Sequence, residues 1–505
     1  MAIIGIDLGT TRSLVAMIDD LGRPQIIHNS EGDNLTPSVV YFKSSTQTIV
    51  GKNAKMMLDV NEPNVFKEFK REMGSHTTYP CHGKAITPTD LSTLVLKKIK
   101  QDFEKVVGPA DSIVISVPAN FRNEAREATL AAAHEAGLNT DLLINEPTAA
   151  ALYYAHRSGK QLNGIYVVHD LGGGTLDISV IKAKGEDIEV LSSEGVQKLG
   201  GKDFDQKIMD LVASKFKKQV DKEFKSSDYG FGYNEAEELK KSLSSLEEKK
   251  VRIVGQDIPP TVISVTRKEF EEAISSYLAQ IEMICEAALV EANIKVSEVT
   301  DVFLAGGSSR IPIVQRMLSK FFGKKLDIYA NPDEAIALGA AIYAGYKTHK
   351  SKLNTMQAQA IKGMRFQEVA PAYFGTISLD AEKLSNGIRC QLNSIIINKN
   401  EKIPCSQKDT FYTIADDQAA VNCIITQSPN QETDPRFVRV IWDGKLDIPP
   451  RPRGQAIDIT YSYSENGIMH AEFLDVASGR KTEIDISSKS IGSETTININ
   501  DFLVE

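Results

Sequence analysis

The chain has 505 residues, which at about 150 residues per domain predicts roughly three domains rather than one core. Lys and Arg number 58 against 67 Asp and Glu, and the net charge of -9 disfavours general binding to nucleic acid or to anionic membranes. Hydrophobic residues at 42% and charged residues at 25% are ordinary globular values and exclude a largely disordered chain.

The sequence shows neither a targeting signal nor a closely spaced cysteine pair. The sequence has no apolar run of about 18 residues and does not start with a basic stretch followed by an apolar one, so we expect a soluble, unexported protein. Its five scattered cysteines include no Cys-x-x-Cys pair, which argues against a disulfide framework and a zinc site. These features predict the reducing cytoplasm.

Short apolar runs alternate with amphipathic helices up to about residue 345, which predicts layered α/β architecture. Buried strands are expected at 2–7, 112–118, 165–170 and 301–306. A helix is expected over 123–137, with Asn123 at its N-cap. Apolar residues at three- and four-residue spacing predict one long helix over 268–292.

From about residue 371 the apolar pattern becomes twofold, which predicts an antiparallel β module. In this module Ile457, Ile459, Tyr461 and Tyr463 should share one face, followed by a turn at Asn466-Gly467. Residues 347–367 show no strand run, and we interpret them as a helix tail and a linker. The predicted domains are therefore an α/β domain, a linker segment, a β domain and a polar tail, over residues 1–350, 351–370, 371–486 and 487–505.

Three glycine turns follow predicted strands, and two of them share the letters Asp-Leu-Gly. They are DLGTTRS at 7–13, DLGGGTLD at 170–177 and LAGGSSR at 304–310. Any one of them is equally well explained as a structural turn, but the set favours backbone N–H groups that cradle phosphate. None is a G-x-x-x-x-G-K-[ST] loop or a clean G-x-G-x-x-G fingerprint.

The repeated Asp-Leu-Gly turn predicts two similar lobes that face a cleft. Asp7 and Asp170 would then lie on opposite lobes and could hold a hydrated Mg²⁺, an ion that keeps several waters and accepts a few carboxylates. The alternative is that each carboxylate only caps its own loop.

Eight ordered motifs resemble the successive signatures of the seventy-kilodalton heat-shock chaperones of the DnaK type. They are IDLGTTRS, VPANFRNEAR, INEPTAAAL, DLGGGTLDIS, KLGGKDFD, EELKKSLSS, LAGGSSRIP and NPDEAIALGAA, and the resemblance covers residue 2 to about 486. It implies an α/β actin-like ATPase domain with duplicated, ribonuclease-H-like lobes, followed by an all-β sandwich that binds peptides. FKREMGSHT and residues 205–245 resemble the specialised bacterial C-type branch.

The resemblance implies a site for ATP or ADP with Mg²⁺, and K⁺ is a further candidate. It places these residues around the nucleotide: Gly9, Thr10, Thr11, Arg12, Gly172, Gly173, Gly174, Thr175, Gly200, Gly201, Glu237, Lys240, Ser244, Gly306, Gly307, Ser308, Arg310 and Asp333. Lys70 matches the family's catalytic lysine, and Glu146, Asp170 and Thr175 would orient water and the metal's ligands.

Without the resemblance, some of these residues have plainer interpretations. Glu237 and Lys240 would be an i,i+3 pair on a solvated helix, and Lys70 within KEFKR would be a solvated lysine. Glu146 would simply be well placed near a helix start, next to Pro147.

In the β module the resemblance places Phe411, Ile414 and Val421 at an apolar pocket and an arch over an extended peptide. By pattern alone these three residues would be sandwich core.

Three features depart from the family pattern. The linker reads GMRFQEVAP, from Gly363 to Pro371, and its Arg365 and Gln367 predict weaker docking between the domains and peptide release that changes only a few-fold between ATP and ADP. Leu142 stands where the family commonly has an arginine used by J-domain partners, which puts that partnership in question. The chain ends where the family's helical lid would begin, so the lid is absent or truncated.

The sequence thus predicts an ATP-dependent chaperone whose partners are unfolded or client polypeptides, with a nucleotide exchange factor as an open question. Neither nucleic acid nor a membrane is an expected partner. A small-molecule kinase on the same actin-like fold is the alternative, because fold does not fix function, and a filament protein is a third possibility. Neither of these needs the β module.

Overall fold

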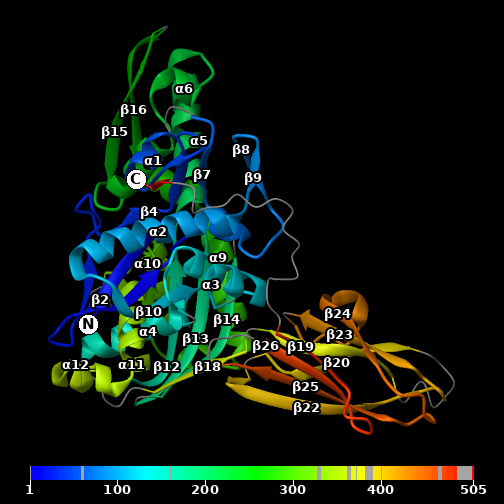
Figure 1. The fold of residues 1–505 in the computed structure, drawn as a ribbon. Coiled ribbons are helices and arrows are strands. Elements are labelled where there is room, and N and C mark those ends of the chain that lie inside the picture. Colours follow the sequence, from blue (N-terminus) through cyan, green and yellow to red (C-terminus); the bar gives the residue numbers. More distant parts are fainter. Residues whose placement is uncertain are drawn as a thin grey trace.

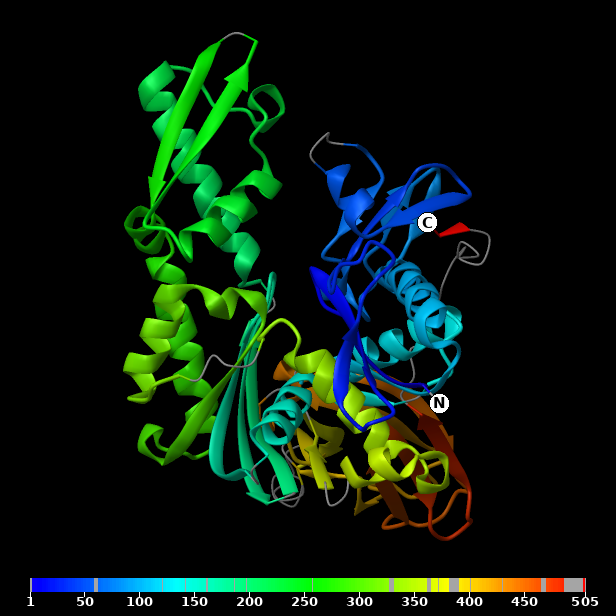
Figure 2. The same cartoon turned by 90° about the vertical axis from the view of Figure 1, so that its left-hand side faces the viewer.

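The computed structural model describes residues 2–58, 62–119, 121–140, 142–159, 162–185, 187–196, 198–256, 258–326, 331–360, 365–370, 372–380, 390–399, 401–428, 430–464, 469–485 and 503–504. These form two α/β lobes and a separate β domain, which lies at the lower right of Figure 1. Figure 2 shows the two lobes side by side, with the β domain at the lower right. We call residues 2–159 lobe I, residues 162–326 lobe II and residues 372–485 the β domain.

The sheet of lobe I is built around its first strand. Its order is β11 (Leu143–Asn145), β10 (Ala110–Val117), β1 (Ala2–Asp7), β2 (Arg12–Ile18) and β3 (Pro24–Ile27), with β4 (Thr36–Pro37) also paired to β2. Every residue of β1 is buried, as expected for a continuous apolar run in the middle of a sheet. β1 is parallel to β10 and antiparallel to β2, so the chain reverses directly after Asp7.

The sheet of lobe II repeats this arrangement. Its order is β17 (Val299–Ala305), β12 (Leu162–Leu171), β13 (Leu176–Gly185), β14 (Asp187–Val196), β18 (Arg365–Val369) and β21 (Lys402–Ile403). Like β1, β12 has a parallel neighbour on one side and an antiparallel one on the other. Asp7 and Asp170 therefore occupy matching places near the ends of matching strands, and the four predicted strands are confirmed.

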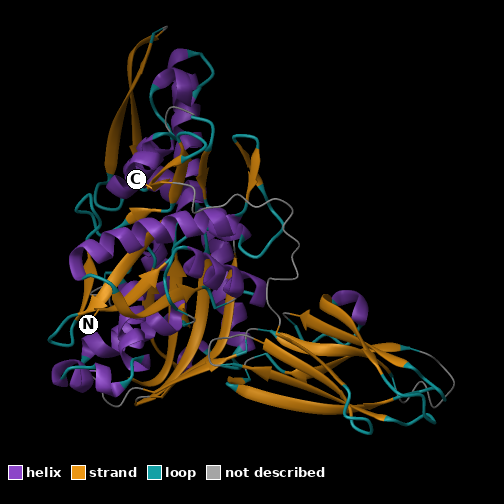
Figure 3. Cartoon of the chain, viewed as in Figure 1, coloured by secondary structure: helices purple, strands orange, loops and turns teal. Residues whose placement is uncertain are grey.

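Helices cover both sheets, as Figure 3 shows. Lobe I carries α1 (Lys52–Met56), η1 (Phe69–Glu72), α2 (Pro88–Val107), α3 (Asn123–Glu135) and α4 (Glu146–Ser158). Lobe II carries α5 (Gly201–Val220), α6 (Ser226–Tyr229), α7 (Tyr233–Leu243), α8 (Arg267–Ala273), α9 (Ser275–Glu291), η2 (Val296–Glu298), η3 (Gly307–Arg310) and α10 (Pro312–Phe322). The later α11 (Ala335–Lys347) packs against α4 and β1, where a Cβ on Gly339 would lie 1.7 Å from the Ala149 carbonyl oxygen.

Two helix predictions need correction. The single helix expected over 268–292 is two helices, α8 and α9, which meet at Ile274 with a bend of 57°. The apolar spacing continues across the break, so periodicity alone could not reveal it. Asn123 is the first residue of α3 rather than its N-cap, which is Arg122.

The β domain is a pair of four-stranded antiparallel sheets, as the twofold pattern predicts. One sheet has the order β20 (Gln391–Ile397), β19 (Tyr373–Leu379), β23 (Ala420–Ser428) and β24 (Arg439–Asp447). The other has β22 (Cys405–Tyr412), β25 (Ala456–Tyr463), β26 (Met469–Asp475) and β27 (Lys481–Asp485), and η5 (Pro435–Phe437) lies between strands. The residues predicted to share one face of β25 are all buried. The turn predicted at Asn466-Gly467 lies outside the described residues.

The segment that joins lobe II to the β domain contains a strand, which the sequence pattern did not predict. After η4 (Lys350–Lys352) and α12 (Thr355–Ala360), β18 pairs in parallel with β14 and antiparallel with β21. Gly363, Met364 and Pro371 of the predicted linker lie outside the described residues. Strand pairing uses main-chain groups, so a polar sequence such as RFQEV forms it without an apolar run. β18 thus contacts both lobe II and the β domain in this structure. The strength of the docking between these two parts stays a prediction.

Ion pairs fasten the β domain to both lobes. Lys399 lies 3.1 Å from Glu194 and 3.4 Å from Glu291, both in lobe II. Arg439 lies 3.0 Å from Glu124 on α3 of lobe I. The β domain thus bridges the bases of the two lobes.

The outer part of lobe I holds a small sheet of β28 (Leu503–Val504), β6 (Gln47–Val50), β5 (Val39–Phe42) and β7 (Val65–Lys67). The hairpin β8 (Tyr79–Cys81) and β9 (Lys84–Ile86) lies nearby, and lobe II has the long hairpin β15 (Glu248–Gly255) and β16 (Ile258–Thr266). β28 belongs to the segment predicted as a polar tail, yet Val504 is buried. Residues 487–502 and Glu505 of that segment lie outside the described residues.

Candidate functional site: a cleft between two lobes

A cleft of about 730 Å³ lies between the lobes and is lined by both Asp-Leu-Gly turns. This volume lies within the usual range for small-molecule sites. The predicted nucleotide-site residues all line it except Gly174 and Gly200. Those two glycines pack on each other beside the cleft, where a Cβ on Gly200 would lie 2.5 Å from the Gly174 nitrogen.

The two Asp-Leu-Gly turns meet across the cleft. A Cβ on Gly173 would lie 2.4 Å from the Thr11 hydroxyl oxygen of the opposite lobe. The first turn is tight, since a Cβ on Gly9 would lie 2.0 Å from the Arg12 carbonyl oxygen. The second is closed by the Gly172 N–H, which donates to the Thr175 carbonyl at 3.0 Å. Glycine is thus required at Gly9, where its own turn is tight, and at Gly173, which lies against the Thr11 side chain, and such turns are suited to cradling phosphate.

Carboxylates gather behind the turns. Asp7 and Asp170 are 8% and 9% exposed, and the Ser116 hydroxyl donates to Asp7 at 3.1 Å. Burial, and then the charge of Glu146, raises the pKa of Asp7 to about 7. The same two causes raise the pKa of Asp170 well above its ordinary value. The negative charge here is therefore poorly balanced by the protein, and a divalent cation would balance it.

The charge of Lys70 acts on both of these carboxylates and lowers the pKa of each. This lysine lies in η1 and is only 5% exposed, and its Nζ donates to Glu146 at 2.7 Å. Burial would lower the pKa of Lys70, but the charges of Glu146 and then Asp7 outweigh burial and raise it. Lys70 is thus held as a buried cation, not as the solvated lysine that its sequence context suggests.

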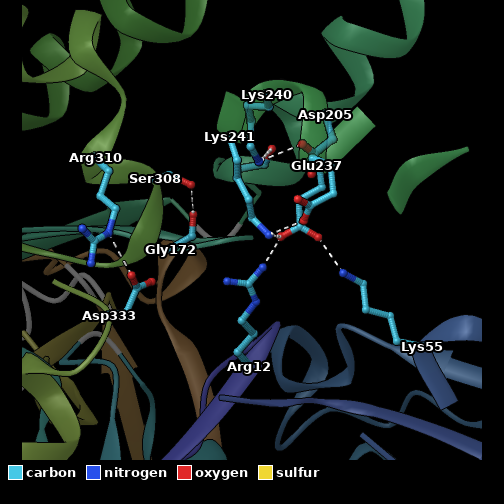
Figure 4. A network of polar contacts seen from close by, with 12 residues as sticks. Arg12, Lys55, Gly172, Asp205, Glu237, Lys240, Lys241, Ser308, Arg310 and Asp333 are labelled. Carbon is cyan, nitrogen blue, oxygen red and sulfur yellow. Dashed lines mark hydrogen bonds and ion pairs between the residues drawn. The ribbon is translucent and has the colours of Figure 1, made fainter. Parts of the chain in front are cut away.

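Glu237 joins the lobes on the other side of the cleft, as Figure 4 shows. It lies on α7 of lobe II and pairs with Arg12 and, at 2.6 Å, with Lys55, both of lobe I. Burial alone would raise the pKa of Glu237, but the charges of Arg12 and Lys55 hold it well below its ordinary value. The alternative of a solvated i,i+3 pair with Lys240 is wrong, because Lys240 turns to Asp205 at 2.7 Å and is 8% exposed.

The third glycine turn completes the wall of the cleft. The Ser308 hydroxyl donates to the Gly172 carbonyl at 2.9 Å, which ties this turn to the second Asp-Leu-Gly turn. Arg310 lies 2.9 Å from Asp333, and both side chains are labelled in Figure 4.

Several residues of the cleft were not predicted from the sequence. Four charged side chains line the cleft and bridge the lobes, namely Lys55, Glu68, Arg71 and Lys202. Glu68 pairs with Lys202, and Arg71 donates to the Gly174 carbonyl at 2.6 Å. Glu68 has a φ of 61°, an unusual backbone conformation for a residue other than glycine, directly before η1. No sequence motif distinguishes these four residues, because each is one charged residue within a segment that holds other charged residues.

The residues fit Mg²⁺ and a nucleotide. Facing glycine turns suit phosphate, and Asp7 and Asp170 suit a hydrated Mg²⁺, which takes few protein ligands. Among the described residues, no group of three or more His, Cys, Asp or Glu side chains is placed to hold a metal ion.

Comparison with known families agrees with this geometry. The model of the Hsp70 protein family matches residues 3–81 and 77–500. The chain belongs to the Hsp70 family. Membership supports ATP binding and a chaperone role in general terms, and it agrees with a mixed α/β region followed by a β-sandwich. Assignment to the C-type branch stays a prediction.

In this Hsp70-family chain the predicted peptide-binding residues lie at the margin of the β domain. Phe411 and Val421 are partly buried and pack against the core, and Ile414 is 40% exposed. Phe411 and Val421 are therefore half-buried and Ile414 is exposed, and the assignment of all three stays a prediction. β22, which carries Phe411, is an edge strand whose residues are mostly exposed.

A search for membrane-spanning segments among the described residues finds no single helix of sufficient length and apolarity. Only the bent pair α8 and α9 passes such a test when taken together.

Proposed function

We propose that this chain is an ATP-dependent chaperone that binds exposed apolar peptide segments and hydrolyses ATP slowly to regulate their affinity. The observation that carries the proposal is the cleft, where two facing glycine turns converge with a buried lysine and several carboxylates. The matching sheets of the two lobes support a duplicated, actin-like origin of that cleft.

The cleft residues have distinct roles in this proposal. Bound MgATP would supply the reacting γ-phosphate and the metal's positive charge. Asp7 and Asp170 would hold the metal's waters, and the glycine turns would position the phosphates. Lys70 holds a positive charge where negative charge develops on the phosphate oxygens, and Glu146 keeps that lysine in place at 2.7 Å. The Thr175 hydroxyl would orient water. K⁺ remains a candidate without a site assigned to it.

The β domain supplies the peptide end. The edge strand β22 offers main-chain groups to an extended segment, Phe411 on β22 and Ile414 just after it offer apolar surface, and Val421 lies on β23 of the other sheet. β18 and the ion pairs of Lys399 and Arg439 link this domain to both lobes, which gives nucleotide and peptide a physical route to influence each other.

Partners and location follow as proposals. Unfolded or client polypeptides are the expected ligands, in the cytoplasm. A J-domain partner stays in question because Leu142 packs against the core of the lobes instead of offering a charge. A nucleotide exchange factor remains open.

Steady-state ATP turnover tests the proposed function. We expect slow turnover that rises several-fold with an unstructured apolar peptide and does not rise with sugars or acetate. Turnover that depends on a small-molecule phosphate acceptor would favour the kinase alternative and contradict the chaperone.

Val421→Phe tests the peptide end. A bulkier side chain in a peptide pocket should block binding of a fluorescent apolar heptapeptide without lowering the melting temperature. A loss of about 1–3 kcal/mol of stability would instead mark Val421 as overpacked core.

A further inference from the structure

The edge of β6 carries a strand from a distant part of the chain. β28 pairs in parallel with β6, with Leu503 opposite Gln47 and Val504 opposite Thr48. The other edge of β6 is already taken by β5. Without β28, β6 would present an open row of main-chain groups, which proteins usually cover. In Figure 2 the red strand at the C label lies beside the blue outer part of lobe I.

Side-chain burial accompanies this pairing. Val504 is 8% exposed and belongs to the apolar core of lobe I, together with Val40 and Val50 of the same small sheet. β28 also lies against α2. Backbone pairing plus one buried aliphatic side chain is the combination by which sheet edges recognise extended segments.

The pairing is connected to the cleft through a short path. β6 ends at Val50, and Gly51 leads directly into α1, which packs against β6. α1 carries Lys55, which reaches Glu237 across the cleft at 2.6 Å. A segment that holds β6 in place therefore also holds α1, and with it the main chain of Lys55, whose side chain bridges the lobes.

We propose that the β6 edge is a docking site for an extended apolar segment, filled by residues 503–504 of the same chain, and that this docking favours the closed cleft. The docking itself is independent of the proposed function, whereas its effect on the cleft rests on nucleotide binding there.

Amide hydrogen exchange of the full chain tests the docking. Val504→Asp should speed exchange of the β6 amides on the edge toward β28 by about tenfold or more, since an unpaired edge is open to water, whereas the β6 amides bonded to β5 should stay protected. Val476→Asp is the matched control, because Val476 is 51% exposed and lies outside every strand. A synthetic peptide with residues 499–505, INDFLVE, should restore protection of β6 in Val504→Asp, and the same peptide with Val replaced by Asp should not. Unchanged exchange at β6 in Val504→Asp would overturn the proposal.

The occupant and the consequence are tested separately. Protection of β6 that is independent of protein concentration, in a monomer by light scattering, supports docking within one chain, and protection that appears only with dimers overturns it. Release of a fluorescent ADP analogue should be several-fold faster in Val504→Asp, and combining it with Lys55→Met should add little if both act through α1. Native release with lost β6 protection overturns the link to the cleft. Failure of every form of the protein to bind nucleotide would count against the proposed function and leave the docking result standing.

Discussion

The Glu146 carboxylate, and not water, holds Lys70 in the cleft. The positive charge of Lys70 can therefore stabilise the negative charge that would develop on the phosphate oxygens during hydrolysis. Lys70→Ala should abolish single-turnover hydrolysis of ATP and leave nucleotide binding largely intact, because this charge matters most in the transition state. Quenched-flow hydrolysis and equilibrium binding of a fluorescent nucleotide measure the two effects. Hydrolysis at the native rate would show that the assignment of Lys70 is wrong.

Glu237 offers a prediction about pH. Its pKa is held below the ordinary value in the folded protein, so the unfolded chain binds more protons than the folded one as the pH falls below about 4.5. The stability that Glu237 contributes is therefore complete above that pH and is lost as the pH falls. The difference in unfolding midpoint between the native chain and Glu237→Gln should be largest near neutrality and shrink as the pH falls below about 4.5. A difference that grows on acidification would contradict the ion pairs with Arg12 and Lys55.

At the scale of elements, the contact between α4 and α11 depends on one missing methyl group. Gly339→Ala would bring a Cβ to 1.7 Å from the Ala149 carbonyl, so the helices must separate, at a cost of about 3 kcal/mol or more. Thermal or urea unfolding measures the loss.

Gly172→Ala is the control for this prediction, because its Cβ would meet nothing closer than 3.7 Å. Equal effects of the two substitutions would show that backbone freedom, and not helix packing, governs these glycines.

Sequence reasoning succeeded for elements that have a local signal. The strands around Asp7 and Asp170 are unbroken apolar runs, and β25 alternates strictly, so their environments could be inferred from their own letters. It failed for the break at Ile274 and for β18, whose pairing with β14 depends on a partner more than a hundred residues away. In the cleft, motifs located the glycine turns, whereas the role of Lys55 exists only because folding places it opposite Glu237.

At the scale of the whole molecule, Lys399 is a half-buried cation between two carboxylates of lobe II. Lys399→Glu would set three negative charges together, so we expect the β domain to separate from lobe II and the radius of gyration to rise in small-angle scattering. Adding Glu194→Lys should restore part of the compact form.

The control for Lys399→Glu is Lys408→Glu, because Lys408 pairs with Asp458 inside the β domain. An equal rise in radius for this control would show that net charge, and not the contact between domains, sets the shape.

The strand β18 makes the boundary between the domains run through a sheet. A fragment cut at residue 350, where the sequence pattern places the domain end, would leave the outer edge of β14 bare from Asp187 to Glu189 and onward. Bare edges recruit other strands, so such a fragment should self-associate during purification. Extending it to residue 370 would let the fragment carry its own covering strand. For anyone producing the two-lobe region alone, the practical end of that unit lies after the linker and not before it.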